Sequence, residues 1–555
     1  SPRVLEKKVR VARVSRVHAR RVTRSLPLRS VSCASTSAER SDSSPRNTGT
    51  AFWTLSRRAR RAAPRVLSQS YAQLTARAQV IYTISDEVGR KRYGQDFRSH
   101  KYFGALHNSI DYCFHGNLAF LTAHPAFSLE LDRSLRAVDP TVGSQPYWDF
   151  MLDADLGPQW FDSPVYQEDW YGTVDNPESD HGRVRGRFRN VTTIYDGDNE
   201  YPNAHHNPYG FITGEYDLTN TGVLTRTNHF CGYKNTQPFP ACGNMRGCFE
   251  NYTTLAMFDR CMEDTVHANL HGLHGGYWGC AADLSAFRDN HTGWATDSLL
   301  SFLVANIAEE VVTKASSLFP YISCPSTCVL GVDNFTTCHC NSTVPPVDTL
   351  DDDAVYDYLE WALAKMHEGY LGDHFMTKNH STGEHVFKHI TDAQDRELKR
   401  LYLRLLREPG NFGVFATGAA ANDPLFWPMH PIFDKMTQAL RMAPAFAATV
   451  NFTWDNAGMC DAGDPQSAEW WGKQPFEDLF GASEAAAARD DGGDRHGKHD
   501  AKLGARKLAR SYSNADLWEL FRPDGDDIPY VYDQLAAWGT CDWDPLAVTA
   551  GELRW

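Results

Sequence analysis

No run of about 18 consecutive apolar residues occurs in the chain of 555 residues, so the sequence predicts no membrane-spanning helix. Acidic residues are scarce in one region only, because positions 1–66 hold 17 Lys and Arg but 3 Asp and Glu. Since the whole chain has a net charge of −14, the remaining residues carry a net charge of −28. We therefore expect no nucleic-acid partner for the folded part of the chain.

The basic segment 1–66 is rich in Arg and Ser and shows no apolar periodicity, which is a composition typical of disorder. Three interpretations of this segment stay open: an organelle transit peptide, a basic tail, or a precursor remnant outside the mature fold. At the other end, residues 541–555 are expected to form a C-terminal tail. The folded domain is then expected to span residues 67–540.

Thirteen cysteines are distributed unevenly, with ten of them from Cys231 to Cys460. Seven Asn-x-Ser/Thr sequons accompany them. Dense cysteine together with sequons favours an oxidising environment, so we expect mostly disulfides, N-glycosylation, and a secreted or lumenal protein. An organelle location directed by segment 1–66 is the alternative. The sequons are at Asn190, Asn251, Asn290, Asn334, Asn341, Asn379 and Asn451.

Four of these cysteines, in CPSTC and CHC, have a spacing that structural zinc sites also use. Two sequons flank the second pair, which favours a disulfide knot. We therefore predict no zinc. The four cysteines are Cys324, Cys328, Cys338 and Cys340.

Apolar residues recur at helical spacing through most of the folded part, so the fold is expected to be mainly α. Residues 150–250 are rich in Gly, Asn, Asp and Pro and are expected to form loops around the helices. Residues 281–420 are interpreted as a helical, cysteine-rich insertion, and residues 483–508 as a charged low-complexity loop. Helices are predicted within 67–112, 125–138, 252–274, 298–315, 354–371 and 391–408, and after residue 430.

Five histidines fall into two groups whose spacing suggests a paired metal site. His267 and His271 are four residues apart, so both lie on one helix face, with Cβ atoms about 6 Å apart, where two imidazoles can share a metal ion. A solvated helix face carries the same pattern. His115 and His124 are half a helical turn out of phase, so one must lie in a loop and the other at a helix start. His124 and His430 are each followed by Pro, which the first turn of a helix tolerates.

The segments around these histidines resemble those of the type-3 copper proteins, which include tyrosinases, catechol oxidases and mollusc-type haemocyanins. HGNLAFLTAHPAFSLELDRSL resembles the family's HxxxxFLxWHRxxLLxxE, and QPYWDF resembles its PYWDW. VHANLHGLHGG is similar to HNxxHxxxGG, DPLFWPMHPIFD to DPxFxxHHxxxD, and PYVYD to a closing Tyr-x-Tyr element. The matches extend from about Ser70 to Tyr532.

The resemblance implies a four-helix bundle that holds two copper ions, each bound by three imidazoles, with O2 as co-substrate. His107 resembles the family's first ligand, although its spacing to His115 is shorter than usual, and His100 is the alternative. The implied ligands are His107, His115 and His124 for the first copper, and His267, His271 and His430 for the second.

The same resemblance implies roles for other residues. Cys113, two residues before His115, is expected to form a thioether to that ring, with a free thiol or a disulfide as alternatives. Asp434 is expected to orient a backbone or Arg partner without touching copper. Glu263 is the candidate catalytic residue, because it could hold a water near the site. His274 is expected to face away from the metal and to make a structural hydrogen bond.

Several positions depart from the family pattern. Ala268 stands where members with strong monophenolase activity carry Asn, which makes catechol oxidation the better-supported reaction. Met429 replaces the first His of the family's HH pair, and Pro125 replaces the usual Arg. Residues 281–420 lengthen the stretch of sequence between His271 and His430, and they are expected to form a disulfide-bonded, glycosylated cap.

We therefore expect a secreted polyphenol oxidase that uses O2 to oxidise o-diphenols to o-quinones, with monophenol hydroxylation left open. Small phenols or catechols are the expected partners. Two other classes stay open: a haemocyanin-like O2-binding protein, and a copper-free structural glycoprotein with the same bundle. Because few residues follow Tyr532, we expect no β-rich domain that would block the site, which favours the enzyme. The oligomeric state is not predicted.

Overall fold

The computed structural model describes most of the chain from residue 78 onwards, together with the short strand β1 (Val11–Ala12). Apart from that strand, the expectations for residues 1–66 and 483–508 lie outside the described residues, as do the cysteines of CPSTC and CHC. The described ranges are 78–142, 144–174, 182–193, 201–204, 222–234, 238–250, 253–308, 321–323, 341–368, 372–407, 410–443, 452–454, 465–476, 512–525 and 541–547, with short runs between 479 and 539.

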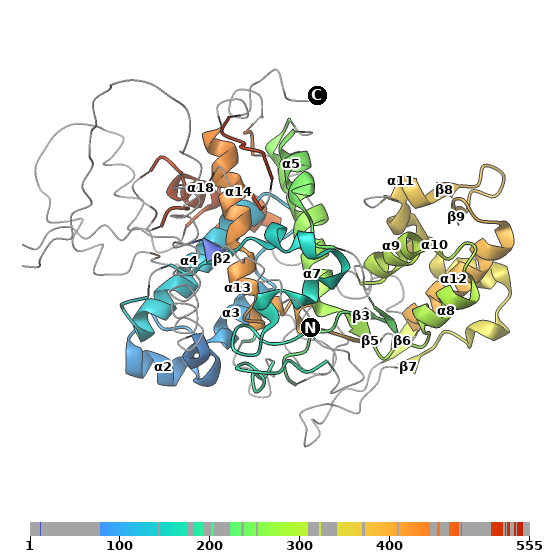
Figure 1. Ribbon diagram of the computed structural model, residues 1–555, viewed down its shortest axis with the longest axis horizontal. Coiled ribbons are helices and arrows are strands. Elements are labelled where there is room, and N and C mark those ends of the chain that lie inside the picture. The colour runs from blue at the N-terminus through green and yellow to red at the C-terminus, as the bar shows by residue number, and fades with distance from the viewer. Residues whose placement is uncertain are drawn as a thin grey trace, which may run out of the picture.

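Helices surround one large buried core at the centre of the fold, so the expected mainly α class is confirmed (Figure 1). Among them, α4 (Phe120–Val138) packs against α14 (Pro431–Met442) and α18 (Asn514–Leu520). The central helical segments are α3 (His100–His107), α4 (Phe120–Val138), the continuous run of α6 (Leu255–Arg260), η5 (Cys261–His267) and α7 (Ala268–Gly275), and the pair α13 (Phe426–Met429) and α14 (Pro431–Met442), with α18 (Asn514–Leu520) beside them.

The ends of these helices differ in places from the sequence expectation. Within the region predicted as helical over 67–112, α2 (Asp86–Tyr93) ends at Gly94, where φ is 98°, and α3 starts afresh at His100. The helix α4 begins at Phe120, so Pro125 lies inside it and not in its first turn as predicted. Pro431 is at the start of α14, as predicted, because that position needs no N–H donor.

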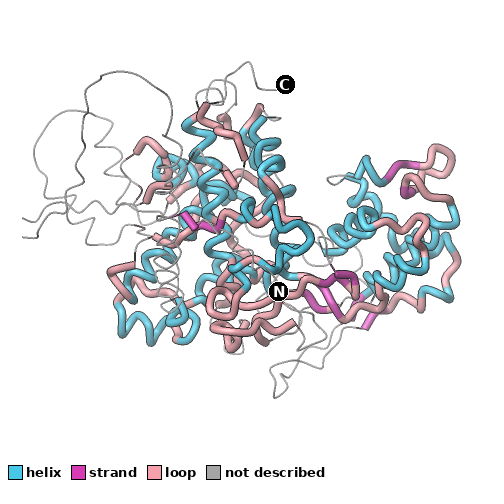
Figure 2. The backbone as a smooth tube through the Cα atoms, viewed as in Figure 1, coloured by secondary structure: helices cyan, strands magenta, loops and turns pink. Residues whose placement is uncertain are grey.

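A small sheet joins the insertion to the bundle (Figure 2). Its strand order is β10 (Asn411–Phe412), β5 (Tyr277–Trp278), β3 (His229–Phe230) and β4 (Tyr233–Lys234). Strand β5 precedes the insertion and β10 follows it, and the two pair antiparallel with each other. The chain therefore leaves for the insertion and returns from it at neighbouring strands, beside the Cys231–Cys280 disulfide.

The insertion has a hydrophobic core cluster that continues onto this sheet, and Figure 1 shows its helices to one side of the bundle. The three helices predicted in it are confirmed, while the hairpin of β8 and β9 had no clear signal in the sequence. Its elements are α8 (Leu284–Asn290), α9 (Asp297–Ala308), β6 (Ile322–Ser323), β7 (Asn341–Ser342), η8 (Val347–Thr349), α10 (Asp352–Glu368), α11 (Gly372–Phe375), β8 (Met376–Lys378), β9 (His385–Phe387) and α12 (Asp392–Arg407).

Short elements and disulfides complete the bundle. Two disulfides, Cys242–Cys541 and Cys248–Cys261, tie α5 (Cys242–Glu250) to the C-terminal region and to η5. Because Trp543 is also buried, the packed fold extends past the expected boundary at residue 540. The remaining elements are β2 (Tyr147–Trp148), η1 (Phe150–Leu152), η2 (Ala154–Asp162), η3 (Pro164–Tyr166), η9 (Val414–Ala416), η10 (Ala420–Asn422) and η11 (Pro465–Ala468).

Two surface properties bear on the sequence expectations. Among the described helices, none combines the length and apolarity needed to cross a bilayer. The side chains of Asn190 and Asn290 are exposed, and Asn379 is half-buried. Glycosylation at these sequons stays a prediction.

A buried ion pair fixes the loop that precedes α13. The Nε and Nη2 atoms of Arg226 each lie 2.6 Å from a carboxylate oxygen of Asp423, and both side chains are fully buried. Arg226 also donates to the carbonyls of Tyr171 and Gly172, while Asp423 accepts from the N–H of Leu425. The pair therefore joins three separate loop regions next to the helix that ends at residue 429.

Asp423→Asn leaves the Arg226 charge buried and uncompensated, so we expect the free energy of unfolding to fall by about 3–5 kcal/mol. Urea unfolding of the metal-free protein measures this change. The matched control is Arg260→Ala, which removes an exposed i,i+4 pair with Asp264 and is expected to cost less than about 0.5 kcal/mol. Equal effects of the two substitutions would show that the buried pair does not stabilise the fold.

Candidate metal centre

Six histidines from different elements converge in the centre of the bundle. They form two groups of three, and within each group one ligand-capable atom from every residue lies within 4.8 Å of the others. The first group comprises His107 at the end of α3, His115 in the loop before α4, and His124 in α4; the second comprises His267 at the end of η5, His271 in α7, and His430 between α13 and α14.

The two groups adjoin each other and so form one paired site. The rings of His124 and His430 stack with centroids 4.6 Å apart. His115 and His267 also stack across the groups, with their centroids 5.7 Å apart. The sequence prediction therefore names six residues that the structure brings together.

Hydrogen bonds to backbone carbonyls fix the orientation of three rings. The Nδ1 atom of His107 lies 2.9 Å from the carbonyl oxygen of Gly418, and that of His271 lies 2.6 Å from the carbonyl of Phe415. His124 Nδ1 lies 3.2 Å from the carbonyl of Phe120, one turn earlier in α4. Because a carbonyl only accepts, each Nδ1 must carry the proton, which leaves a lone pair on Nε2.

Buried ring nitrogens in both groups have no hydrogen-bond partner among the described residues. A buried polar atom without a partner is costly, and a bound cation supplies the missing interaction. The donor set of neutral imidazoles suits copper, zinc or iron, so the residues fit a transition-metal pair. The unpartnered atoms are Nε2 of His107, His124 and His271, and both ring nitrogens of His267 and His430.

Burial keeps the six imidazoles neutral. It lowers the pKa of His107 to about 4 and that of His271 to about 3. The pKa values of the other four lie well below the usual range, first because of burial and then because of the neighbouring imidazoles. Neutral rings at physiological pH can bind a metal ion without first losing a proton.

Two other histidines near the bundle belong to neither group. The ring nitrogens of His100 lie 3.3 Å and 3.2 Å from the carbonyls of Ile81 and Thr192, and the ring stacks on Tyr82. The structure therefore places His107, and not the alternative His100, in the first group. His274 is fully buried and hydrogen-bonds the hydroxyl of Tyr166, as predicted.

A π-helical segment, η5, leads to His267 and was not predicted from the sequence. A π-turn holds more residues than an α-turn and commonly occurs at functional sites. It also contains Glu263, which is buried and whose two carboxylate oxygens accept from the N–H of Gly116 at 2.8 and 3.0 Å. Glu263 therefore links the helix of the second group to the residue that follows His115.

Cys113 is buried beside the first group, but the predicted thioether to His115 is contradicted. Cys113 is disulfide-bonded, and a sulfur already bonded to a second sulfur has no valence left for the imidazole ring. Its backbone N–H donates to the Oγ of Ser467 at 2.8 Å. The position of His115 is therefore held through the backbone on both sides, by Ser467 before it and by Glu263 after it.

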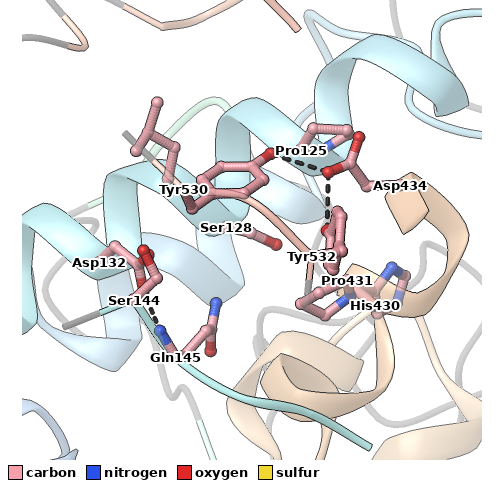
Figure 3. A pocket seen from close by; sticks show the side chains of 11 residues that line it. Pro125, Ser128, Asp132, Ser144, Gln145, His430, Pro431, Asp434, Tyr530 and Tyr532 are labelled. Atoms are coloured by element: carbon pink, nitrogen blue, oxygen red, sulfur yellow. Dashed lines mark hydrogen bonds between the residues drawn. The ribbon is translucent and has the colours of Figure 1, made fainter. Parts of the chain in front are cut away.

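Asp434 is not a member of either histidine group, and its hydrogen-bond partners differ from the prediction. Its carboxylate accepts from the hydroxyls of Tyr530 and Tyr532, at 2.8 and 2.7 Å (Figure 3). It also accepts from Gln438, and not from Arg or the backbone. Burial raises the pKa of Asp434 to about 6. The closing Tyr-x-Tyr element thus anchors to α14 through this carboxyl.

A cavity of about 20 Å³ lies beside Asp434 and its two tyrosines, on the Pro431 side of His430 (Figure 3). Such a volume holds about one water molecule. Burial also raises the pKa of Asp132, at the opposite end of the cavity, to about 6. The cavity is therefore too small for an organic molecule.

Aromatic rings enclose the histidines. Phe426 stacks on His430 with a centroid distance of 3.8 Å and lies edge-on to His107 at 5.0 Å. Phe120 lies 4.5 Å from His124 and 5.0 Å from His267. Each phenyl ring therefore contacts one histidine of each group and lowers the polarity of the site, which strengthens electrostatic interactions there.

The comparisons with known proteins agree with this geometry. Residues 90–292 match a family model described as the common central domain of tyrosinase. The match includes five of the six clustered histidines and ends before His430. No curated protein matched the chain. Over the region that holds five of the six clustered histidines, the chain is therefore similar to the central domain of tyrosinase.

Proposed function

We propose that the protein is a binuclear copper oxidase that uses O2 to convert o-diphenols to o-quinones. The observation that carries this proposal is the pair of three-histidine groups with buried, unpartnered ring nitrogens. His107, His115 and His124 would hold one copper ion, and His267, His271 and His430 the other. Two copper ions held in this way supply the one-electron and O2 chemistry that amino-acid side chains lack.

One side of the paired site is more accessible than the rest. His107, His115 and His271 are half-buried, whereas His124, His267 and His430 are 2–5 % exposed. Beside His271, a side chain added at Gly272 would meet no atom within 4 Å. We propose that small phenolic substrates enter from this side. The three half-buried rings would then face the substrate, and the buried ones would hold the metal pair from beneath.

Catechol oxidation is the reaction that the surrounding residues support best. A catechol loses two electrons and two protons on becoming a quinone, and O2 accepts them. Hydroxylation of a monophenol also needs a base that receives the phenolic proton. Glu263 is the candidate from the sequence, but its two oxygens already accept the N–H of Gly116, and Ala268 supplies no amide that could help to hold a water.

We also propose that the protein matures in the secretory pathway. The disulfides Cys231–Cys280, Cys242–Cys541 and Cys248–Cys261 would be reduced in the cytosol, and exposed sequons support the same location. The insertion between β5 and β10 carries several of the sequons and is proposed to be a glycosylated accessory region.

Copper content tests the ligand assignment. The purified protein is expected to bind two copper ions per chain, measured by elemental analysis after removal of loosely bound metal. His271→Ala is expected to bind about one, and to lower catechol turnover on the order of 100-fold or more. His100→Gln removes a buried histidine outside the groups and is expected to keep both ions. Copper loss in His100→Gln with retention in His271→Ala would overturn the assignment.

Substrate preference tests the reaction. Copper-loaded protein is expected to oxidise 4-tert-butylcatechol and to show little oxidation of tyrosine. The absorbance of the quinone product measures both reactions. Ala268→Asn is expected to raise tyrosine oxidation roughly fivefold, because an added hydrogen bond to a base-acting water contributes about 1 kcal/mol. Efficient tyrosine oxidation by the unaltered protein would refute the role given to Ala268. O2 binding without catechol oxidation would identify an O2-binding protein instead.

A further inference from the structure

We propose that residues 413–418, the positioning loop, hold one histidine of each metal group and couple the loading of the two ions. This inference rests on the proposed function and assigns a role to residues that bind no metal themselves. The loop follows β10 and precedes the segment that leads to His430. The positioning loop is therefore separate from the segments that carry the six histidines.

The loop presents two carbonyl groups three residues apart, one to each metal group. The Phe415 carbonyl accepts from His271 Nδ1 at 2.6 Å, and the Gly418 carbonyl accepts from His107 Nδ1 at 2.9 Å. His107 and His271 lie on different helices, α3 and α7. One short stretch of backbone thus sets the ring orientation of a ligand in both groups.

Local hydrogen bonds make the loop rigid. Residues Val414–Ala416 form the 3-10 turn η9. The hydroxyl of Thr417 donates to the carbonyl of Val414 at 2.8 Å and accepts from the N–H of Ala419 at 3.2 Å. Because Thr417 lies between the two acceptor residues, the carbonyls of Phe415 and Gly418 are held in a fixed relation to each other.

Close backbone contact with α7 sets the position of the loop. A Cβ atom at Gly275 would lie 2.3 Å from the Cβ of Ala416 and 2.5 Å from its backbone nitrogen. A Cβ atom at Gly413 would lie 2.1 Å from the carbonyl oxygen of Gly275. Only glycine fits at both places, so these two residues bring the loop near enough for its carbonyls to reach the rings. Gly275 and Gly413 are therefore positioning residues.

Coupling follows from the shared support. A metal ion bound through His271 fixes that ring against Phe415, which fixes the loop and with it the acceptor for His107. The first ion therefore orders part of the site for the second, and affinity rises by a factor that is the same in either order of binding. A displaced loop removes both acceptors, and each imidazole then loses its preferred tautomer and orientation.

Gly275→Ala in the full-length chain tests the proposal by metal binding and not by turnover. Titration of Cu(I) against a chromophoric chelator is expected to show that both ions bind at least about tenfold more weakly than in the unaltered protein. Gly413→Ala, which displaces the loop from its other side, is expected to give the same result. The control Gly243→Ala adds a methyl group to α5 where no atom lies within 4 Å, and both affinities should stay unchanged.

The signature that separates a shared loop from local damage to α7 is the number of ions affected. His271→Ala should abolish one ion, whereas Gly275→Ala should weaken both. If Gly275→Ala weakens only one ion, or neither, the positioning loop does not couple the groups. Should the alanine variants not fold, Thr417→Val removes the hydroxyl alone and is expected to weaken both ions, with Thr417→Ser restoring them.

The outcome for the unaltered protein distinguishes this inference from the proposed function. If the unaltered protein binds two ions but does not oxidise catechols, the proposed oxidase activity is wrong and the loop variants still decide the coupling. If it binds no copper, both proposals are wrong. Two independent, equal affinities in the unaltered protein would contradict coupling alone.

Discussion

Six clustered neutral imidazoles, five of which have buried ring nitrogens without a hydrogen-bond partner among the described residues, are the constraint on which the rest of the structure depends. Burying such nitrogens costs free energy unless hydrogen bonds or a cation satisfy them. Backbone carbonyls satisfy Nδ1 of His107, His124 and His271, and so direct the remaining lone pairs inward. Phenyl rings of Phe120 and Phe426 exclude water from the same space. The donor set of this arrangement fits a pair of transition-metal ions.

The fold supplies this arrangement from segments that are distant in the sequence. Glu263, through its bonds to Gly116, ties the helix of His267 to the segment of His115. The Arg226–Asp423 pair and the bonds of Asp434 to its two tyrosines tie the segment around His430 to parts of the chain that carry none of the six histidines. The return strand of the insertion, β10, ends directly before residues 413–418. The insertion is therefore connected to the metal centre through backbone, although its helices lie to one side of the bundle (Figure 1).

The mainly α fold and all six histidines could be predicted from the sequence, because helical periodicity and a family-specific spacing are both properties of residue order. The supporting contacts could not. The carbonyls of Phe415 and Gly418 carry no side-chain signal, and the pairing of Arg226 with Asp423 spans 197 residues. The thioether expected at Cys113 was wrong because a Cys-x-His spacing does not say which other cysteine lies nearby. The tyrosine partners of Asp434 were missed because they too lie far from it in the sequence.

A crystal structure of the copper-loaded protein, with anomalous scattering recorded at the copper edge, would test the central claim most directly. The account predicts two copper peaks in the bundle, one bound by His107, His115 and His124 and the other by His267, His271 and His430, with both contacting O2 or solvent on the half-buried side. A single peak, or copper bound elsewhere while the six rings stay empty, would contradict it.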